Sequence, residues 1–141
     1  MAEQICLDVA DKIGVRVCIG RIFSFYHRTQ VGSFLYPNII NRLKTEDLSK
    51  VFELNGGESI RDISSANHIV KKIMCLLNNE YTGVINIGSG KGIKIRDFVQ
   101  QVAFDISKNE INIKSVDDDF SYLVADMSKY NKICLKNSAN E

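Results

Sequence analysis

The sequence predicts an α/β fold, and three observations carry that prediction. Apolar residues recur at helical spacing in four segments. Short β-branched runs lie between these segments, and residues typical of turns separate the two kinds of segment. Strands that alternate with helices typically form a sheet that is at least partly parallel, because each helix returns the chain to the same end of the sheet.

The first predicted helix spans residues 2–13, whose apolar side chains repeat at intervals of three and four. Gly14 follows it, where the end of a helix favours a left-handed backbone. Residues 15–23 are β-branched and largely apolar, which is typical of a strand that is covered on both faces. The stretch Ser24–Gly32 is expected to be an irregular loop and is a candidate site loop.

A second helix is expected to begin near Pro37, because proline is favoured in the first turn of a helix. Residues 51–54 and 59–63 flank Asn55-Gly56-Gly57, a turn signal typical of a β-hairpin. The other predicted elements are helices marked by residues 66–77 and 95–106, and strands at 84–87, 111–113 and 121–125.

Composition limits the classes of protein to which the chain can belong. Its 141 residues make about one domain, and its 18 basic and 17 acidic side chains nearly balance. This balance argues against a strongly electrostatic binder of nucleic acid or of an acidic membrane. No apolar run approaches the ~20 residues of a membrane-spanning helix, and no secretion signal precedes the first helix.

The cysteines Cys6, Cys18, Cys75 and Cys134 lie far apart, without the close ligand pairs of a zinc site. We therefore expect four free, buried thiols in a cytoplasmic protein, and no metal site. The chain also opens directly in a helix, with no preceding strand. An α/β sheet normally covers its strands with neighbouring βα units, so the sequence is expected to be part of a larger fold.

Five stretches carry a resemblance to a known family. They are Arg21-Ile22-Phe23-Ser24-Phe25-Tyr26, Leu35-Tyr36-Pro37-Asn38-Ile39-Ile40, Asn55-Gly56-Gly57-Glu58-Ser59-Ile60-Arg61-Asp62, Asn86-Ile87-Gly88-Ser89-Gly90-Lys91-Gly92-Ile93-Lys94-Ile95-Arg96 and Ala125-Asp126-Met127-Ser128-Lys129. In order and spacing they resemble motifs in the C-terminal half of extended short-chain dehydrogenases/reductases, the NAD-dependent nucleotide-sugar epimerase/dehydratase family. Each motif alone is weak, but the five together cover nearly the whole chain.

The resemblance implies a truncated fold of this family. Residues 1–32 would be the tail end of the Rossmann domain, with one helix and one strand of its sheet. Residues 33–141 would be the small mixed α/β region that binds the nucleotide sugar, interleaved with remaining Rossmann-type strands. The family's glycine-rich cofactor turn and its Tyr-x-x-x-Lys catalytic pair lie upstream of the segment present. The complete enzyme would use NAD or NADP, whereas this chain alone is expected to retain neither and to be catalytically inactive.

The implied function is that of the substrate-binding part of an NAD(P)-dependent nucleotide-sugar epimerase, 4,6-dehydratase or 4-ketoreductase. Such an enzyme acts on activated sugars for surface-polysaccharide or deoxysugar synthesis. Its expected partners are a nucleoside-diphosphate sugar and a separately encoded Rossmann half, and family members are often homodimers. Two alternatives stay open: a stand-alone, non-catalytic module that binds nucleotide sugars, and the remnant of an interrupted gene.

Arg61 is the strongest candidate site residue, because the resemblance places a diphosphate-binding arginine there. A guanidinium can hold two phosphate oxygens at once and stays charged. The alternative is a surface ion pair with the adjacent Asp62. Ser24 stands where the family usually carries an asparagine that bonds the substrate, and its alternative is a loop serine bonded to local backbone.

The resemblance aligns four further residues with residues that lie near the nucleotide base. Phe52 and Leu54 match residues that flank the base, and Tyr36 and Pro37 match the segment beside it. Apolar and aromatic side chains suit the flat face of a base. For Phe52, the alternative is an ordinary core residue of a strand.

Three other features are considered for a binding role, and the sequence does not favour that role for any of them. The glycine-rich stretch 88–92 runs from a strand to a helix but fits neither phosphate-loop template, so a structural turn is favoured. Asp117-Asp118-Asp119 is expected to be a solvated acidic turn and not a metal site. Val116 lies near the position where many members of the family carry a second phosphate-binding arginine.

Overall fold

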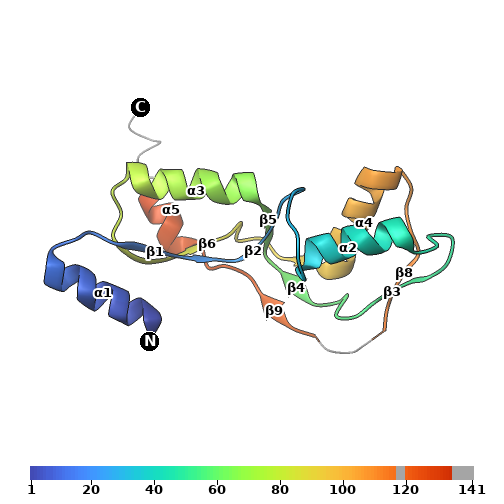
Figure 1. Ribbon diagram of the computed structural model, residues 1–141, viewed down its shortest axis with the longest axis horizontal. Coiled ribbons are helices and arrows are strands. Elements are labelled where there is room, and N and C mark those ends of the chain that lie inside the picture. Colours follow the sequence, from blue (N-terminus) through green and yellow to red (C-terminus); the bar gives the residue numbers. More distant parts are fainter. Residues whose placement is uncertain (117–119, 135–141) are drawn as a thin grey trace.

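The computed structural model describes residues 1–116 and 120–134, so the predicted acidic turn at 117–119 lies outside the described residues. The described part is an α/β fold of five helices and nine short strands, gathered into two lobes that short strands connect (Figure 1). None of the helices in this part is long and apolar enough to cross a membrane.

β1 (Cys18–Ile22) and β6 (Gly83–Ile87) form a parallel pair in the first lobe, in register from Cys18 opposite Gly83 to Ile22 opposite Ile87. α3 (Ala66–Asn78) and α5 (Ser128–Cys134) lie on one side of this pair, and α1 (Ala2–Ile13) lies on the other side (Figure 1). The buried side chains of this lobe are Ile69, Leu76, Ile85, Ile87, Ala125, Met127, Tyr130 and Cys134.

The second lobe has a separate core around α2 (Leu35–Thr45) and α4 (Ile95–Ser107). β3 (Phe52–Leu54) and β8 (Ile113–Ser115) form a parallel pair beside these helices, with Phe52 opposite Ile113. The buried side chains here are Ile39, Leu43, Phe52, Leu54, Phe98, Val99, Val102, Ala103 and Ile111.

The short strands β2 (Ser24–Tyr26), β4 (Ile60–Arg61), β5 (Ile63–Ser65) and β9 (Tyr122–Leu123) lie between the two lobes (Figure 1). β2 pairs in parallel with β5. β4 is the centre of a three-stranded sheet, with β7 (Ile93–Lys94) antiparallel on one side and β9 parallel on the other. These strands bring segments from distant parts of the chain together at the junction of the lobes.

The buried carboxylate of Asp62 holds this junction. Asp62 is 1% exposed and accepts hydrogen bonds from the Ser89 N–H (2.8 Å), the Ser89 hydroxyl (2.6 Å), the Gly90 N–H (2.8 Å) and the Ala125 N–H (3.3 Å). Gly88 is needed here, because a Cβ atom at this position would lie 2.5 Å from Oδ2 of Asp62. The glycine-rich stretch is therefore a structural turn, closed around a carboxylate of its own chain.

Much of the predicted element order is confirmed. All four predicted helices are present, and Gly14 ends α1 with a φ of 69°. α2 begins at Leu35, two residues before Pro37, so the proline lies within the first turn. The structure adds α5 and β7, which were not predicted because seven and two residues are too few to show a clear period.

The predicted hairpin around Asn55-Gly56-Gly57 is wrong. The chain does turn there, since the Ser59 N–H bonds the Gly56 carbonyl, but the flanking strands β3 and β4 do not pair with each other. They pair instead with strands from later in the chain. Residues 24–32 are also not wholly irregular, because they begin with β2.

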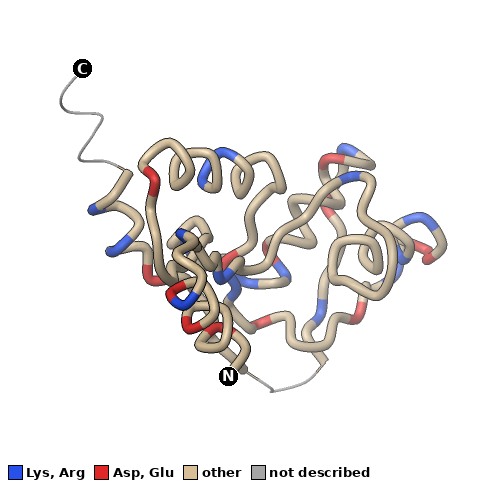
Figure 2. Tube along the Cα trace, turned by 60° about the vertical axis from the view of Figure 1, so that its left-hand side comes forward, with Lys and Arg blue, Asp and Glu red and all other residues tan. Residues whose placement is uncertain are grey.

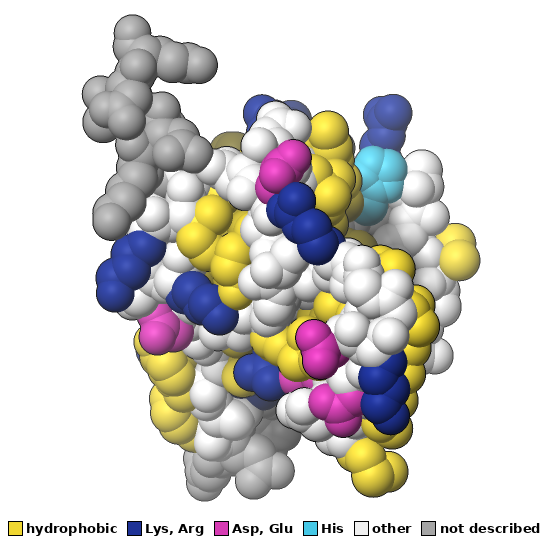
Figure 3. All heavy atoms as spheres, turned by 90° about the vertical axis from the view of Figure 1, so that its left-hand side faces the viewer, with side chains coloured by type: hydrophobic (Ala, Val, Ile, Leu, Met, Phe, Trp, Pro, Cys, Tyr) yellow, Lys and Arg dark blue, Asp and Glu magenta, His cyan; other side chains and the backbone are white. Residues whose placement is uncertain are grey.

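The described residues do not supply the cover that the apolar first strand and first helix were expected to receive from neighbouring βα units. β1 pairs with β6 and with no other described strand, and four of its five residues are exposed. On α1, Ile5 is 55% and Ile13 65% exposed. Figure 3 shows hydrophobic side chains among charged ones on the side of the molecule that carries α1.

The prediction of four free, buried cysteines is also wrong. Cys75 on α3 and Cys134 at the end of α5 form a disulfide, with Cα atoms 6.2 Å apart, whereas Cys6 and Cys18 are free and exposed. The separation of 59 positions between the bonded cysteines hid their proximity in the sequence, because α5 itself was not predicted.

We expect loss of this disulfide to destabilise the oxidised chain. Cys75→Ala opens a covalent loop of about 60 residues, which should lower the free energy of unfolding by about 3–4 kcal/mol. Urea unfolding without reductant measures this change, with Cys18→Ala as the control. Equal stabilities of Cys75→Ala and wild type under oxidising conditions would contradict the expectation.

Asp62→Asn should be a second strongly destabilising change. An amide nitrogen would face backbone N–H groups that now donate to a carboxylate, so at least one buried donor loses its partner. We expect a loss of about 3 kcal/mol in the free energy of unfolding. Thermal melting beside the control Asp97→Asn, at an exposed position of α4, checks this prediction. A change as small as that of the control would show that the carboxylate is not needed.

Candidate functional site

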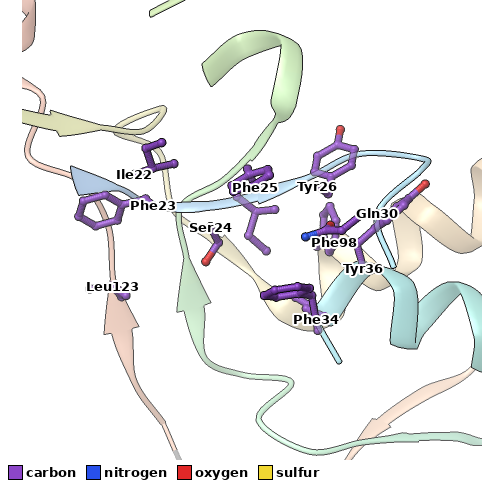
Figure 4. Close-up of a pocket in the computed structure, with 12 residues that line it drawn as sticks. Ile22, Phe23, Ser24, Phe25, Tyr26, Gln30, Phe34, Tyr36, Phe98 and Leu123 are labelled. Carbon is purple, nitrogen blue, oxygen red and sulfur yellow. The ribbon is translucent and has the colours of Figure 1, made fainter. Parts of the chain in front are cut away.

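A pocket of about 660 Å³ lies where the two lobes meet (Figure 4). This volume is typical of sites for small molecules. Its walls are largely aromatic and aliphatic, and the lining residues are Ile22, Phe23, Ser24, Phe25, Tyr26, Gln30, Phe34, Leu35, Tyr36, Ile63, Phe98 and Leu123.

Three aromatic rings form a packed group on one side of this pocket. The Tyr26 ring centroid is 5.2 Å from that of Tyr36 and 5.3 Å from that of Phe98. These distances are typical of favourable aromatic pairs. Because the rings come from β2, α2 and α4, they fix the start of α2 against both neighbours.

Ser24 begins β2, opposite Ile63 of β5, and its hydroxyl is exposed in the pocket (Figure 4). Within the described residues this hydroxyl has no hydrogen-bond partner. The structure therefore does not show the alternative, in which the serine hydroxyl bonds local backbone. Its contact with a substrate stays a prediction.

Arg61 on β4 is half-buried and is held by its neighbours. Nη1 donates to the carbonyls of Ile60 and Ser121, each at 2.9 Å, and Nη2 donates to the Ser121 hydroxyl at 2.5 Å. No ion pair with Asp62 is present among the described residues, because that carboxylate faces the turn at 88–90. The guanidinium is therefore oriented by neutral groups, and its charge is not neutralised by a described carboxylate.

The position of Arg61 relates it to the pocket. Arg61 ends β4, and Ile63, which lines the pocket, begins β5 two positions later. Arg61 is also the registered partner of Leu123 on β9, a second lining residue. Arg61 itself is not among the lining residues, but it lies on the strand beside two residues that are.

The structure separates the four predicted base-binding residues. Tyr36 lines the pocket, and Pro37 is half-buried in the next position of α2. Phe52 and Leu54 are only 2% and 4% exposed and belong to the core of the second lobe. The Arg42 guanidinium lies 4.0 Å from the centroid of the Phe52 ring. Phe52 and Leu54 are therefore core residues, which was the alternative given for Phe52. Their contact with a base stays a prediction.

Several lining residues were not singled out from the sequence, namely Phe25, Gln30, Phe34, Phe98 and Leu123. The only signal was position, because three of them fall in or beside the candidate site loop. No cluster of three or more metal-ligating side chains exists among the described residues.

Glu58 lies in the turn that precedes β4, and an ion cluster around it connects this turn to the second lobe. The Glu58 carboxylate accepts from Nζ of Lys94 at 2.8 Å, from Nη1 of Arg96 at 3.0 Å and from the Ser115 hydroxyl at 3.2 Å. These contacts, that of Lys94 first, lower the pKa of Glu58 from 4.5 to about 2. Elsewhere along the described trace, basic and acidic residues are interspersed (Figure 2).

The sequence matches the family described as GDP-mannose 4,6 dehydratase over residues 1–136. No curated protein matches it. Among solved structures, RMD from Pseudomonas aeruginosa, complexed with NADPH, is similar with a TM-score of 0.74 and 22% identity, over 94% of this chain and 46% of that chain.

Two epimerases are similar in the same way. The UDP-N-acetylglucosamine 4-epimerase from Methanobrevibacter ruminantium M1, in complex with UDP-N-acetylmuramic acid, has a TM-score of 0.71 and 22% identity, over 93% of this chain and 44% of that chain. The UDP-glucuronic acid 4-epimerase from Bacillus cereus, in complex with UDP-glucuronic acid and NAD, has a TM-score of 0.73 and 21% identity, over 94% of this chain and 43% of that chain. These likenesses show the fold, and the chain spans less than half the length of each structure.

The Glu58 cluster should make stability depend on pH. Because the folded-state pKa is below the ordinary value, the stabilisation is fully present above about pH 4.5 and is lost as the pH falls towards about 2. Glu58→Gln should therefore be less stable than wild type at pH 6, and the difference should shrink at pH 4 and again at pH 3. Urea unfolding at these pH values measures it.

The matched control is Glu53→Gln, since the Glu53 carboxylate forms no ion pair among the described residues. Its difference from wild type should vary less with pH. A Glu58→Gln difference that stayed constant from pH 6 to pH 3 would contradict the assignment.

Proposed function

Because this chain belongs to the GDP-mannose 4,6-dehydratase family of extended short-chain dehydrogenases/reductases, we propose that it is the part of a nucleotide-sugar epimerase, 4,6-dehydratase or 4-ketoreductase that binds the substrate. The observation that carries the proposal is Arg61, whose guanidinium is fixed without a described acidic partner on a strand whose neighbour Leu123 lines an apolar pocket. Arg61 would bind the diphosphate of a nucleoside-diphosphate sugar.

The surroundings of Arg61 support an anionic ligand. Its bonds to Ser121 fix the direction of the guanidinium before any ligand arrives, which lowers the entropic cost of binding. Nε and the remaining N–H groups have no partner within the described residues, so they are available to phosphate oxygens. A phosphate would also supply the negative charge that the described neighbours do not.

The pocket supports the rest of such a ligand. Aromatic walls from β2 and α2 suit planar or partly apolar groups, and the Ser24 hydroxyl offers one polar contact. Nucleotide sugars also occur in similar structures, one of which holds UDP-glucuronic acid and another UDP-N-acetylmuramic acid.

We propose that a nicotinamide dinucleotide does not bind at the glycine-rich turn of this chain. The turn at 88–92 follows β6, where a pyrophosphate could be sought, but the Ser89 and Gly90 N–H groups are bonded to Asp62. We therefore place NAD or NADP, which similar structures contain, on another Rossmann half. The edge of β1 that has no described partner supports such a half as a neighbour.

On this view the chain alone is catalytically inactive, and its contribution to an enzyme of surface-polysaccharide or deoxysugar synthesis is binding. The same site would serve a non-catalytic module for nucleotide sugars, because Arg61 and the pocket need no cofactor to bind a diphosphate. A cytoplasmic location and a homodimeric assembly stay predictions, and the disulfide between Cys75 and Cys134 is a cross-link that a reducing cytoplasm does not favour.

Replacement of Arg61 tests the proposal. Arg61→Ala removes a charge-assisted, two-pronged contact worth about 1.5–3 kcal/mol, so the affinity for UDP or GDP should fall roughly 10- to 150-fold. Arg61→Lys should recover little, because an ammonium group cannot reproduce the fork. Calorimetric titration of each diphosphate into the chain measures both effects.

Arg16→Ala is the matched control, because Arg16 is exposed and pairs with Glu80. It should leave the affinity unchanged. Equal affinities of wild type, Arg61→Ala and Arg61→Lys would return Arg61 to a purely structural role.

A further inference from the structure

Ser121 holds the Arg61 guanidinium at two points. Its carbonyl accepts from Nη1 at 2.9 Å, and its hydroxyl accepts from Nη2 at 2.5 Å. The Ile60 carbonyl accepts a further bond from Nη1, also at 2.9 Å. A guanidinium has five N–H groups in one plane, so these three bonds occupy both hydrogens of Nη1 and one hydrogen of Nη2.

The N–H groups that remain lie along one edge of the guanidinium. A guanidinium can hold two oxygens of an anion at its end, through Nη1 and Nη2, or at its side, through Nε and Nη2. Ser121 covers the end, because its two oxygens bond both Nη atoms. Nε makes no hydrogen bond among the described residues. The side edge is therefore where Arg61 can hold two oxygens of one anion.

Ser121 is itself fixed by Ser59, a serine that is only 3% exposed. The Ser121 N–H donates to the Ser59 hydroxyl oxygen at 3.1 Å, and the two hydroxyl oxygens lie 3.3 Å apart. The Ser59 carbonyl accepts in turn from the Ile95 N–H at 3.0 Å, at the start of α4. Two serines therefore connect the guanidinium of Arg61 to a helix of the second lobe.

We propose that Ser121, supported by Ser59, is a positioning residue that restricts Arg61 to its side edge, so that Nε and Nη2 bind two oxygens of one phosphate group. The inference rests on the proposed function, since it needs a diphosphate at Arg61. Neither serine touches the ligand, and both act through the arginine. The gain is preorganisation, because a guanidinium that is already held loses less freedom when the ligand binds.

The Ser121 hydroxyl is the part of this arrangement that a substitution can remove. Without it, Nη2 has a free hydrogen at the end of the guanidinium, and only the bonds of Nη1 to two backbone carbonyls remain. Ser121→Thr keeps the hydroxyl, whereas Ser121→Val has the shape of threonine without it. The position is exposed and directly precedes β9, so it has room for the added methyl group.

The first test is calorimetric titration of UDP and of inorganic pyrophosphate into the 141-residue chain. Ser121→Val should bind both probes about three- to tenfold more weakly than wild type, and Ser121→Thr should restore most of the affinity. Ser59→Ala should give a smaller loss. Ser49→Ala is the control, because it also removes an exposed serine hydroxyl that is bonded to a neighbour. Equal affinities of the threonine and valine variants would overturn the inference.

A double-mutant cycle shows whether Ser121 acts through the arginine. In an Arg61→Ala background, Ser121→Val should cause no further loss of affinity, because there is no guanidinium left to orient. A loss of the same size with and without Arg61 would overturn the positioning role.

NMR of the arginine side chains in wild type identifies the edge that binds, even where a variant is unstable. The Nε–H signal of Arg61, identified by its absence in Arg61→Lys, should shift when pyrophosphate is added. A shift of the Nη signals alone would show binding at the end of the guanidinium, which would overturn the inference and leave the proposed function standing. Absence of Arg61-dependent binding of both probes would overturn the proposed function and the inference with it.

Discussion

The carboxylate of Asp62 is the point on which the arrangement of this chain depends. It takes four hydrogen bonds from residues 27 to 63 positions later in the sequence, and it is almost completely buried. A buried charge of this kind is tolerable only when its oxygens are fully bonded. The turn at 88–90 and the start of the segment leading to α5 must therefore stay in place around it. Arg61, the adjacent residue, owes its position on β4 to the same constraint.

The two lobes have separate hydrophobic cores, and the pocket occupies the space that neither core fills. β2 and β5 cross this junction as strands of only three residues, so the side chains beside them are drawn from both lobes. This explains why an apolar pocket carries a few polar groups. Ser24 and Gln30 line the pocket, whereas the Arg61 guanidinium is held by hydrogen bonds to Ile60 and Ser121.

Local patterns predicted the helices because apolar residues at helical spacing need no knowledge of distant partners. Gly14 and Pro37 marked helix ends for the same reason. Strand pairing was less predictable, because β3 and β4 are short and pair with strands that lie 30 or more residues later. For the site, the sequence and the resemblance singled out Ser24 and Tyr36, which both line the pocket, and Arg61, which lies on the neighbouring strand β4. They did not indicate Gln30, whose Oε1 atom is buried without a hydrogen-bond partner among the described residues.

The disulfide between Cys75 and Cys134 has a consequence for the integrity of the chain. The covalent ring that it closes contains β6, all of α4 and the strands β7, β8 and β9. A protease that cut one peptide bond inside this ring would produce two fragments that remain a single covalent molecule. Such a nicked chain would separate into pieces only after reduction, so an intact band on a non-reducing gel would not prove an intact backbone.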